Sequence, residues 1–335
     1  MKKIINAADD VAREALEGYA ECYKEWYEIH PEVNGIWLKN RRADKVALIV
    51  GGGSGHEPMF SGFVGKGLAD AAACGDIFAS PDPNTICETA LALQPSKGIL
   101  FLYGNYAGDN LNFDMAEEFL EEEKIASAHV RVNDDCASAP SERMDDRRGI
   151  AGDLFAIKIA GAACESGYDL KAAAAVTKRA VEQMRSIGIA TSPGQIPGLD
   201  RPTFEIGDDE MEYGMGIHGE KGIKRTKLET ADVIAEELFK KLQEELGLSC
   251  KDEICVLVNG LGSTTLLEMS IVYRRLNELF SALQVKIHDA DINSYCTCQE
   301  MGGLSVTVLK LDDELKKLYD APCCSPYYFK EGCVK

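Results

Sequence analysis

The sequence predicts an α/β protein of two domains, each a mostly parallel or mixed sheet flanked by helices. Three observations lead to this class. Short apolar runs alternate with helical patterns over residues 45–132, as in layered α/β folds. A second block with the same alternation follows residue 230, and 335 residues exceed one average domain. Several Gly and Pro residues at 188–203 mark a boundary, so we expect domains over 1–190 and 191–335.

The first block contains both helical and strand patterns. Residues 7–28 carry apolar side chains at near-helical spacing and predict an amphipathic helix. The almost continuous apolar runs at 45–50, 98–103 and 126–132 are typical of strands buried in a parallel sheet. Further helices are predicted at 85–94, 112–124, 150–167 and 170–187.

The second block predicts a similar layer. Acidic residues precede lysines in the segment 312–318, an order that suits the dipole of a short helix. The stretch from Val258 to Thr265 is interpreted as a turn followed by a helix N-cap. The C-terminal tail resembles no packed element. The remaining elements are predicted as helices at 230–246 and 264–281 and strands at 253–258, 284–288 and 304–310.

The charge balance restricts the possible partners. Lys and Arg number 36 against 55 Asp and Glu, a formal charge of −19, which argues against binding to nucleic acid or to an anionic membrane. The first residues show no signal peptide, and no apolar run approaches the roughly 18 residues of a membrane span. We therefore expect a cytoplasmic protein.

The 12 cysteines are scattered along the chain, from Cys22 to Cys333, which favours reduced thiols over a disulfide framework. The pairs Cys296-Thr-Cys298 and Cys323-Cys324 do not have zinc-site spacing, and no histidine accompanies them. No metal site is predicted.

A glycine-rich loop follows the first predicted strand directly. Its sequence is Gly51-Gly-Gly-Ser-Gly-His-Glu-Pro58, and glycines allow backbone N–H groups to approach a ligand closely. The loop lacks the Gly-Lys-Ser/Thr ending of a Walker A motif and the Gly-x-Gly-x-x-Gly pattern with its acidic residue. A small polar ligand is therefore favoured over a dinucleotide. His56 is a candidate acid or base, and the alternative is a histidine that caps a turn.

A second candidate segment, Tyr103-Gly-Asn-Tyr-Ala-Gly-Asp109, also follows a predicted strand. Ligands of open α/β sheets bind outside the carboxyl ends of the strands, so His56 and Asp109 are expected at the same sheet edge. Asp109 would accept a proton from a hydroxyl or orient His56. The alternative is an N-cap for a helix that begins near Leu111.

His218 lies in Glu210-Met-Glu-Tyr-Gly-Met-Gly-Ile-His218-Gly-Glu220, with glycines at 214, 216 and 219. These glycines remove side-chain bulk, so a small substrate can reach the imidazole edge. A neutral imidazole can attack a carbonyl carbon, and histidine is known to form covalent intermediates. His218 is the best nucleophile candidate, and the alternative is a structural histidine in a turn.

Taken together, these segments resemble the K subunit family of dihydroxyacetone kinase, and the similarity spans nearly the whole chain. The matching motifs are Gly51 to Pro58, Gly62-Phe-Val-Gly-Lys-Gly67, Cys74-Gly-Asp-Ile-Phe-Ala-Ser-Pro81, Asn105-Tyr-Ala-Gly-Asp109, Arg148-Gly-Ile-Ala-Gly152, Glu210 to Glu220, Leu257-Val-Asn-Gly-Leu-Gly262 and Asp320-Ala-Pro322.

The resemblance implies that His218 binds dihydroxyacetone covalently as a hemiaminal. Gly53 would bind the substrate through its backbone, with Ser54 and Gly55 beside it, and His56 and Asp109 would hold the hydroxyls and help to deprotonate the reacting one. The resemblance further implies a homodimer that carries no nucleotide. A separate L subunit would supply ATP, or a tightly held ADP, with magnesium.

One position departs from the family pattern. The family commonly has Lys-Asn-Tyr-x-Gly-Asp, and its lysine contacts the substrate, whereas this chain has Gly104. The lost charge and the added room leave a longer ketose such as erythrulose open as the substrate. They also leave open a non-catalytic paralogue that senses dihydroxyacetone and acts as a transcriptional coactivator. A general α/β binding protein is a third, separate hypothesis. Retention of both His56 and Asp109 favours the kinase subunit.

Overall fold

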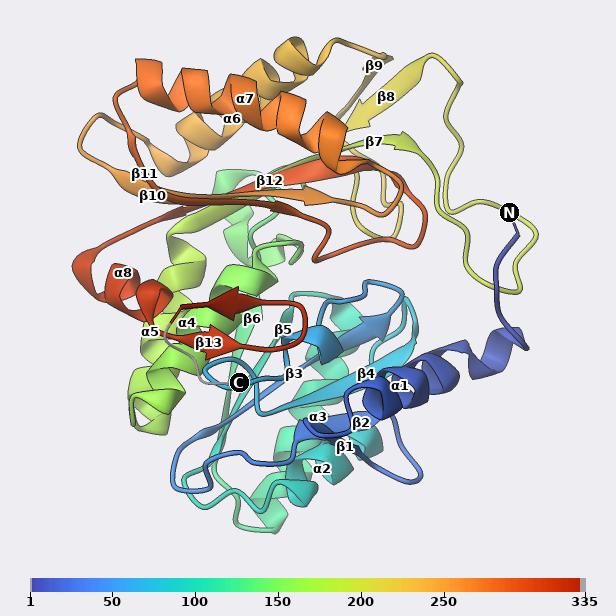
Figure 1. Cartoon of the computed structure of the whole chain (residues 1–335), viewed down its shortest axis with the longest axis vertical. Helices are drawn as coiled ribbons and strands as arrows, with labels where there is room; N and C mark the ends of the chain where they lie inside the picture. The colour runs from blue at the N-terminus through green and yellow to red at the C-terminus, as the bar shows by residue number, and fades with distance from the viewer. Residues whose placement is uncertain (1, 332–335) are drawn as a thin grey trace. The chain divides into compact units, whose positions relative to one another are not determined.

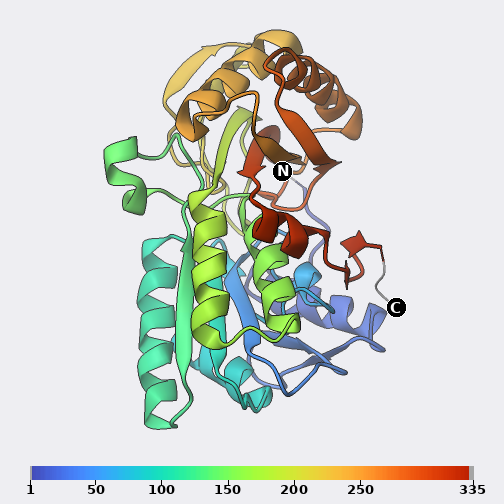
Figure 2. The ribbon, with the colours of Figure 1, turned by 90° about the vertical axis from the view of Figure 1, so that its left-hand side faces the viewer.

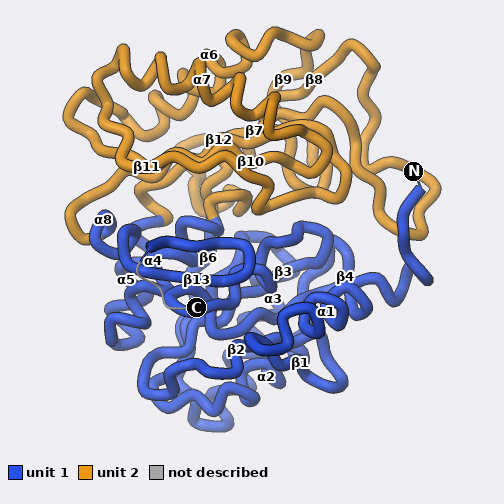
Figure 3. Tube along the Cα trace, in the orientation of Figure 1, with its two compact units in different colours: residues 1–132, 153–180, 315–335 blue, residues 133–152, 181–314 orange. Residues whose placement is uncertain are grey.

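The computed structural model describes residues 2–331, which form two compact units (Figure 1, Figure 3). Each unit contains one six-stranded sheet flanked by helices. The predicted class, two α/β domains with mixed sheets, is therefore confirmed.

The units are not continuous in sequence. The first comprises 1–132, 153–180 and 315–335, and the second comprises 133–152 and 181–314. This division differs from the domains expected from the sequence, 1–190 and 191–335. Each unit is defined by the segments that pack together and not by Gly and Pro content. Strand β7 (Met184–Ser192) belongs to the second sheet, where it pairs with β12 (Gly302–Lys310). The stretch after Ser192 is a loop within the second unit.

The first unit is built on a sheet with the strand order β1-β2-β4-β3-β5-β6. Strands β4, β3, β5 and β6 run parallel, whereas β1 and β2 are antiparallel at one edge. Every residue from Ala47 to Val50 is buried, as expected for an apolar central strand. The strands are β1 (Tyr27–Ile29), β2 (Gly35–Leu38), β3 (Ala47–Ser54), β4 (Ala71–Ile77), β5 (Ile99–Gly104) and β6 (Ser127–Val132).

Two helices, α2 and α3, share a buried apolar cluster with β3, β4 and β5. Helix α4 packs against β3 and β5, and α5 lies beside α4 (Figure 2). The tail forms the short hairpin β13–β14, so the expectation of an unpacked C-terminus was wrong for residues 323–330. The elements are α1 (Val11–Cys22), α2 (Pro83–Ala92), α3 (Ala107–Glu122), α4 (Asp153–Glu165), α5 (Leu170–Glu182), α8 (Asp313–Asp320), β13 (Cys323–Cys324) and β14 (Phe329–Lys330).

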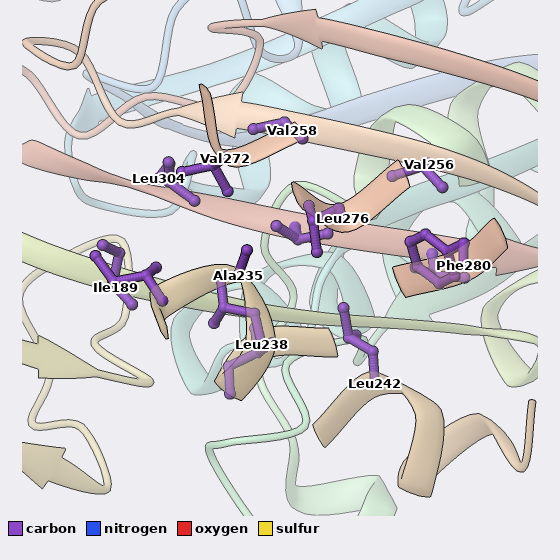
Figure 4. Packing of buried hydrophobic residues seen from close by; sticks show 14 of the residues in the cluster. Ile189, Ala235, Leu238, Leu242, Val256, Val258, Val272, Leu276, Phe280 and Leu304 are labelled. Carbon is purple, nitrogen blue, oxygen red and sulfur yellow. The ribbon is translucent and has the colours of Figure 1, made fainter. Parts of the chain in front are cut away.

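The second unit has a sheet with the order β11-β10-β12-β7-β8-β9, in which only β10 and β11 are parallel. Helices α6 and α7 pack on it through an apolar cluster that includes Leu238, Leu276 and Phe280 (Figure 4). The predicted N-cap is confirmed, because Thr265 caps α7. The remaining elements are β8 (Glu210–Tyr213), β9 (Lys224–Lys227), α6 (Ala231–Leu246), β10 (Glu253–Gly260), α7 (Leu266–Ala282) and β11 (Lys286–Asn293).

Candidate functional site

The glycine-rich loop is fixed against β4 and the chain that follows it. A Cβ on Gly53 would lie 2.8 Å from the nitrogen of Ala79 and 3.0 Å from Phe78 backbone atoms, so only glycine fits this close approach. The Ser54 hydroxyl donates to the Gly75 carbonyl at 2.7 Å, and the Phe78 N–H donates to the Ser54 carbonyl at 2.8 Å. The end of β3 is therefore a rigid backbone surface.

His56 is buried within this loop, with 3% of its surface exposed. Its ring stacks on Phe78, with centroids 4.9 Å apart. Gly55 adopts a φ of 99°, and its N–H donates to a carboxylate oxygen of Glu57 at 2.9 Å. Burial raises the pKa of the Glu57 carboxyl. Stacking on Phe78 restricts the orientation of the imidazole, and the Glu57 contact holds the loop backbone at Gly55.

Asp109 lies at the carboxyl end of the neighbouring strand. Strands β3 and β5 pair in parallel, so the loops that follow them emerge at the same sheet edge. Asp109 is buried in the first turn of α3, which begins at Ala107 and has Tyr106 at its N-cap position. The alternative role as N-cap of a helix beginning near Leu111 is therefore wrong.

Gly104, the last residue of β5, lies between an aromatic ring and a carboxylate. A Cβ there would be 3.3 Å from the Tyr106 ring and 3.6 Å from Oδ2 of Asp153. Asp153 is the buried first residue of α4. The sequence pattern did not point to Asp153, because it looks like an ordinary acid at a helix start. The first unit thus gathers Gly53, Ser54, Gly55, His56, Gly104 and Asp109 at one end of its sheet.

His218 belongs to the second unit, in the loop between β8 and β9. Gly214 and Gly219 have φ values of 74° and 85°, a region that glycine occupies at little cost. The preceding Ile217 is buried, and the imidazole is 25% exposed. The ring is accessible while the backbone that carries it is anchored.

Glu220 holds the histidine through both carboxylate oxygens. Oε1 lies 3.1 Å from His218 Nδ1, and Oε2 accepts the His218 backbone N–H at 2.9 Å. Burial raises the pKa of the Glu220 carboxyl, but the hydrogen bond and charge of His218 and the charge of Arg148 outweigh burial and bring this pKa to about 2. The carboxylate is therefore ionised throughout the neutral range.

Arg148 approaches the same carboxylate, with Nη1 3.8 Å from Glu220 Oε2. Its guanidinium donates to Asp135 Oδ2 from Nε at 3.1 Å and from Nη2 at 2.7 Å, and to the Gly214 carbonyl at 3.3 Å. Burial raises the pKa of Asp135 to about 6, although Arg148 opposes this shift. In the sequence, Glu220 and Arg148 are ordinary members of motifs, and the structure brings together these residues about 70 positions apart.

The free thiols of the described chain include Cys22, Cys74, Cys87, Cys136, Cys164 and Cys250. Cys333 lies outside the described residues. Within residues 2–331, no group of three or more His, Cys, Asp or Glu side chains is arranged to hold a metal ion. Over the same residues, no helix combines the length and apolar character that crossing a membrane requires.

Both the sequence and the fold of this chain match one protein family. A model described as the Dak1 domain matches residues 17–327, and the chain belongs to this family. A curated relative is the dihydroxyacetone-binding subunit DhaK of PTS-dependent dihydroxyacetone kinase 2 from Listeria innocua. It is 40% identical over 330 residues, covering 98% of this chain and 99% of the relative. The predicted resemblance to the K subunit family is confirmed.

Other relatives widen the range of named substrates. An L-erythrulose kinase of Pectobacterium atrosepticum is 39% identical over 335 residues, which cover 98% of this chain but only 56% of the relative.

Solved structures give the same architecture. The dihydroxyacetone kinase of C. freundii superposes with a TM-score of 0.90 at 29% identity, over 100% of this chain and 62% of that one. The dihydroxyacetone kinase operon co-activator Dha-DhaQ superposes with a TM-score of 0.89 at 27% identity, over 95% and 98% of the two chains.

Proposed function

We propose that this chain is the substrate-binding subunit of a dihydroxyacetone kinase and holds dihydroxyacetone as a hemiaminal on His218. The observation that carries the proposal is an accessible imidazole whose Nδ1 faces Glu220 at 3.1 Å. The Nε2 lone pair forms a bond to the ketone carbon, the carbonyl pair moves to oxygen, and that oxygen takes a proton from water, which leaves as hydroxide. Glycerol has no carbonyl and would not react.

His56 and Asp109 act on the hydroxyl groups of the bound ketose. Both are buried side chains at the carboxyl end of a parallel sheet, where small ligands of such folds bind. They hydrogen-bond the hydroxyls and remove the proton of the one that attacks phosphorus. The backbone from Gly53 to Gly55 and the backbone of Gly104 complete the contacts to substrate.

The phosphoryl group comes from another chain. Catalysis of phosphoryl transfer depends mainly on positioning and charge stabilisation, so the substrate and the nucleotide can be held by separate proteins. A partner L subunit carries ATP, or ADP that is recharged, with magnesium, and the product is dihydroxyacetone phosphate. Coverage of 99% of a relative that is itself named as a subunit supports this division. We further propose a cytoplasmic homodimer.

Mass spectrometry of the intact protein tests the nucleophile. Incubation with dihydroxyacetone under native conditions should add the mass of one ketose, and His218→Ala should abolish the addition. A matched control is His288→Ala, because the Nδ1 of His288 also faces a carboxylate, 3.2 Å from Glu253, in the same unit. An adduct that persists in His218→Ala but disappears in His288→Ala would reassign the nucleophile.

Two other functions have an observation in their favour. Gly104 has no side chain that could limit the length of the ketose, and the 39% identity to an L-erythrulose kinase supports that substrate. The structural match to a co-activator supports a dihydroxyacetone sensor. A sensor needs the histidine but no working base, so the retained His56 and Asp109 favour the kinase.

A further inference from the structure

We propose that Asp135, Arg148 and Glu220 form a positioning relay that fixes the tautomer of His218 and directs its Nε2 lone pair to substrate. None of the three is a catalytic residue in this proposal, since each acts through its neighbour. The role of Nε2 as the nucleophile depends on the proposed function, whereas the tautomer does not.

The first step is the contact between Glu220 and His218. An ionised carboxylate only accepts hydrogen bonds, and Glu220 has one oxygen on the backbone N–H of His218 and the other 3.1 Å from ring Nδ1. A lone pair on Nδ1 would face that oxygen with like charge. In the neutral ring the proton therefore resides on Nδ1 and the lone pair on Nε2, as in other carboxylate–imidazole pairs.

The second step is the placement of the carboxylate. Arg148 lies 3.8 Å from the Glu220 oxygen that accepts the backbone N–H, and it also donates to the Gly214 carbonyl at the start of the histidine loop. A guanidinium remains charged and presents its donors in a rigid fork. Arg148 thus holds both the carboxylate and the beginning of the loop.

The third step is the anchor of the arginine. The Asp135 side chain is 1% exposed and accepts from two nitrogens of Arg148 at 3.1 and 2.7 Å. The Ala137 N–H donates to its other oxygen at 3.0 Å. With both oxygens occupied, Asp135 gives the guanidinium a fixed orientation.

Gly216 supports the same interpretation. A Cβ at this position would overlap the Glu220 carboxylate and the Arg148 guanidinium. A glycine here therefore allows these two side chains to approach each other, in addition to opening the loop to substrate.

The relay also matches the charge that develops in the reaction. When Nε2 bonds to the ketone carbon, the ring becomes an imidazolium that keeps its proton on Nδ1. The substrate oxygen gains a proton from water. Glu220 already faces Nδ1 and stabilises the new positive charge without rearrangement.

Nitrogen NMR of ¹⁵N-histidine protein tests the relay without any ketose, with the His218 signals assigned by their loss in His218→Ala. The wild type should show a protonated Nδ1 and an unprotonated Nε2. Glu220→Gln retains one acceptor oxygen in place of two, so the His218 signals should shift toward the tautomer with the proton on Nε2. Its affinity for dihydroxyacetone should fall about 10- to 100-fold, the loss expected for a hydrogen bond to a charged group. Arg148→Lys keeps the positive charge but loses the planar array of guanidinium donors. It should produce a smaller change in the same direction.

The control is Glu236→Gln, since Glu236 pairs with Arg275 on an exposed helix face. It should leave both the His218 signals and the affinity unchanged. Unaltered His288 signals would show that each variant is folded. A wild-type tautomer in both Glu220→Gln and Arg148→Lys would overturn the relay, even if the adduct on His218 is real. An adduct that survives His218→Ala would instead overturn the proposed function and leave the tautomer result standing.

Discussion

At the scale of single residues, Gly104 determines the room and charge at the carboxyl end of β5. Gly104→Lys should fold, because the Tyr106 ring, 3.3 Å from a new Cβ, needs to move only a few tenths of an ångström. The carboxylate of Asp153 lies 3.6 Å from that Cβ. We expect this variant to disfavour erythrulose relative to dihydroxyacetone by about tenfold, within the range for small differences in pocket size. Titration of adduct mass with each ketose measures the ratio.

Gly104→Ala is the control, since it fills part of the space without adding charge. A ratio that changes equally in both variants would assign the preference to volume alone. An unchanged ratio in both would remove position 104 from substrate selection.

The residues of the candidate site differ in how well sequence revealed them. His218 and the glycines around it form a continuous pattern, and their positive φ values agree with it. The ion pair of Glu220 with Arg148 and the position of Asp153 beside Gly104 depend on how distant segments fold together. No spacing rule contains that information.

At the scale of elements, helix caps offer a controlled comparison within the second unit. Thr265 is the N-cap of α7 and forms a capping box. Its side chain accepts a hydrogen bond from the Glu268 backbone N–H, and the Glu268 side chain accepts one from the Thr265 backbone N–H. Thr230 occupies the same position in α6 without a side-chain cap. Thr265→Ala should lower the free energy of unfolding by about 1 kcal/mol, and Thr230→Ala by clearly less. Urea denaturation measures both, and equal losses would contradict the role of the box.

The link between α4 and α8 predicts a dependence of stability on pH. The buried Lys158 donates to the Leu318 carbonyl at 2.8 Å, and burial lowers the pKa of Lys158 from 10.5 to about 8. Between these two values the unfolded chain binds a proton that the folded chain has released, so folding becomes more favourable as pH rises. The stability of wild type relative to Lys158→Met should therefore increase from pH 8 to 10.5, by at most about 3 kcal/mol.

Chemical denaturation at pH 8, 9 and 10 measures the difference in free energy of unfolding between wild type and Lys158→Met. The contributions of other titrating groups, which both proteins share, cancel in this difference. Lys171→Met, at an exposed position of α5, is the control for the loss of a lysine outside the core. A difference that stays flat or falls would contradict the assignment to Lys158.

Element prediction succeeded where the apolar pattern was strong and local. The runs ending at Val50 and Tyr103 became β3 and β5, and the amphipathic pattern at 230–246 became α6. Strand β4 was missed because its Ala-Ala-Ala-Cys sequence has no strand preference, and neighbours on both sides make it a strand. The helix predicted over 170–187 ends at Glu182, since the next residues pair with β12, more than 100 positions later.

At the scale of the whole molecule, the formal charge of −19 is a constraint on partners. A chain this acidic is repelled by nucleic acid, so any role in transcription would pass through a DNA-binding partner. The same charge would attract a partner with a basic surface and speed their encounter at low salt. A dependence of the catalytic rate on ionic strength is therefore expected if transfer requires a second protein.

At this scale, turnover of the wild type with a partner subunit distinguishes a kinase subunit from a sensor, and Asp109→Asn tests the proposed base. Combined with an L-type subunit, magnesium and ATP or a recharging phosphoryl donor, the wild type should convert dihydroxyacetone to its phosphate. Asp109→Asn keeps a similar volume but loses the basic oxygen, so it should retain the mass adduct and lose turnover by about 100-fold or more, as expected for an acid–base group. Asp114→Asn is the control, because Asp114 is a half-exposed acid on α3 that pairs with Arg131.

Adduct formation without turnover in the wild type, with every L-type subunit and donor supplied, would favour the sensor. Full turnover in Asp109→Asn would show that the kinase uses another base.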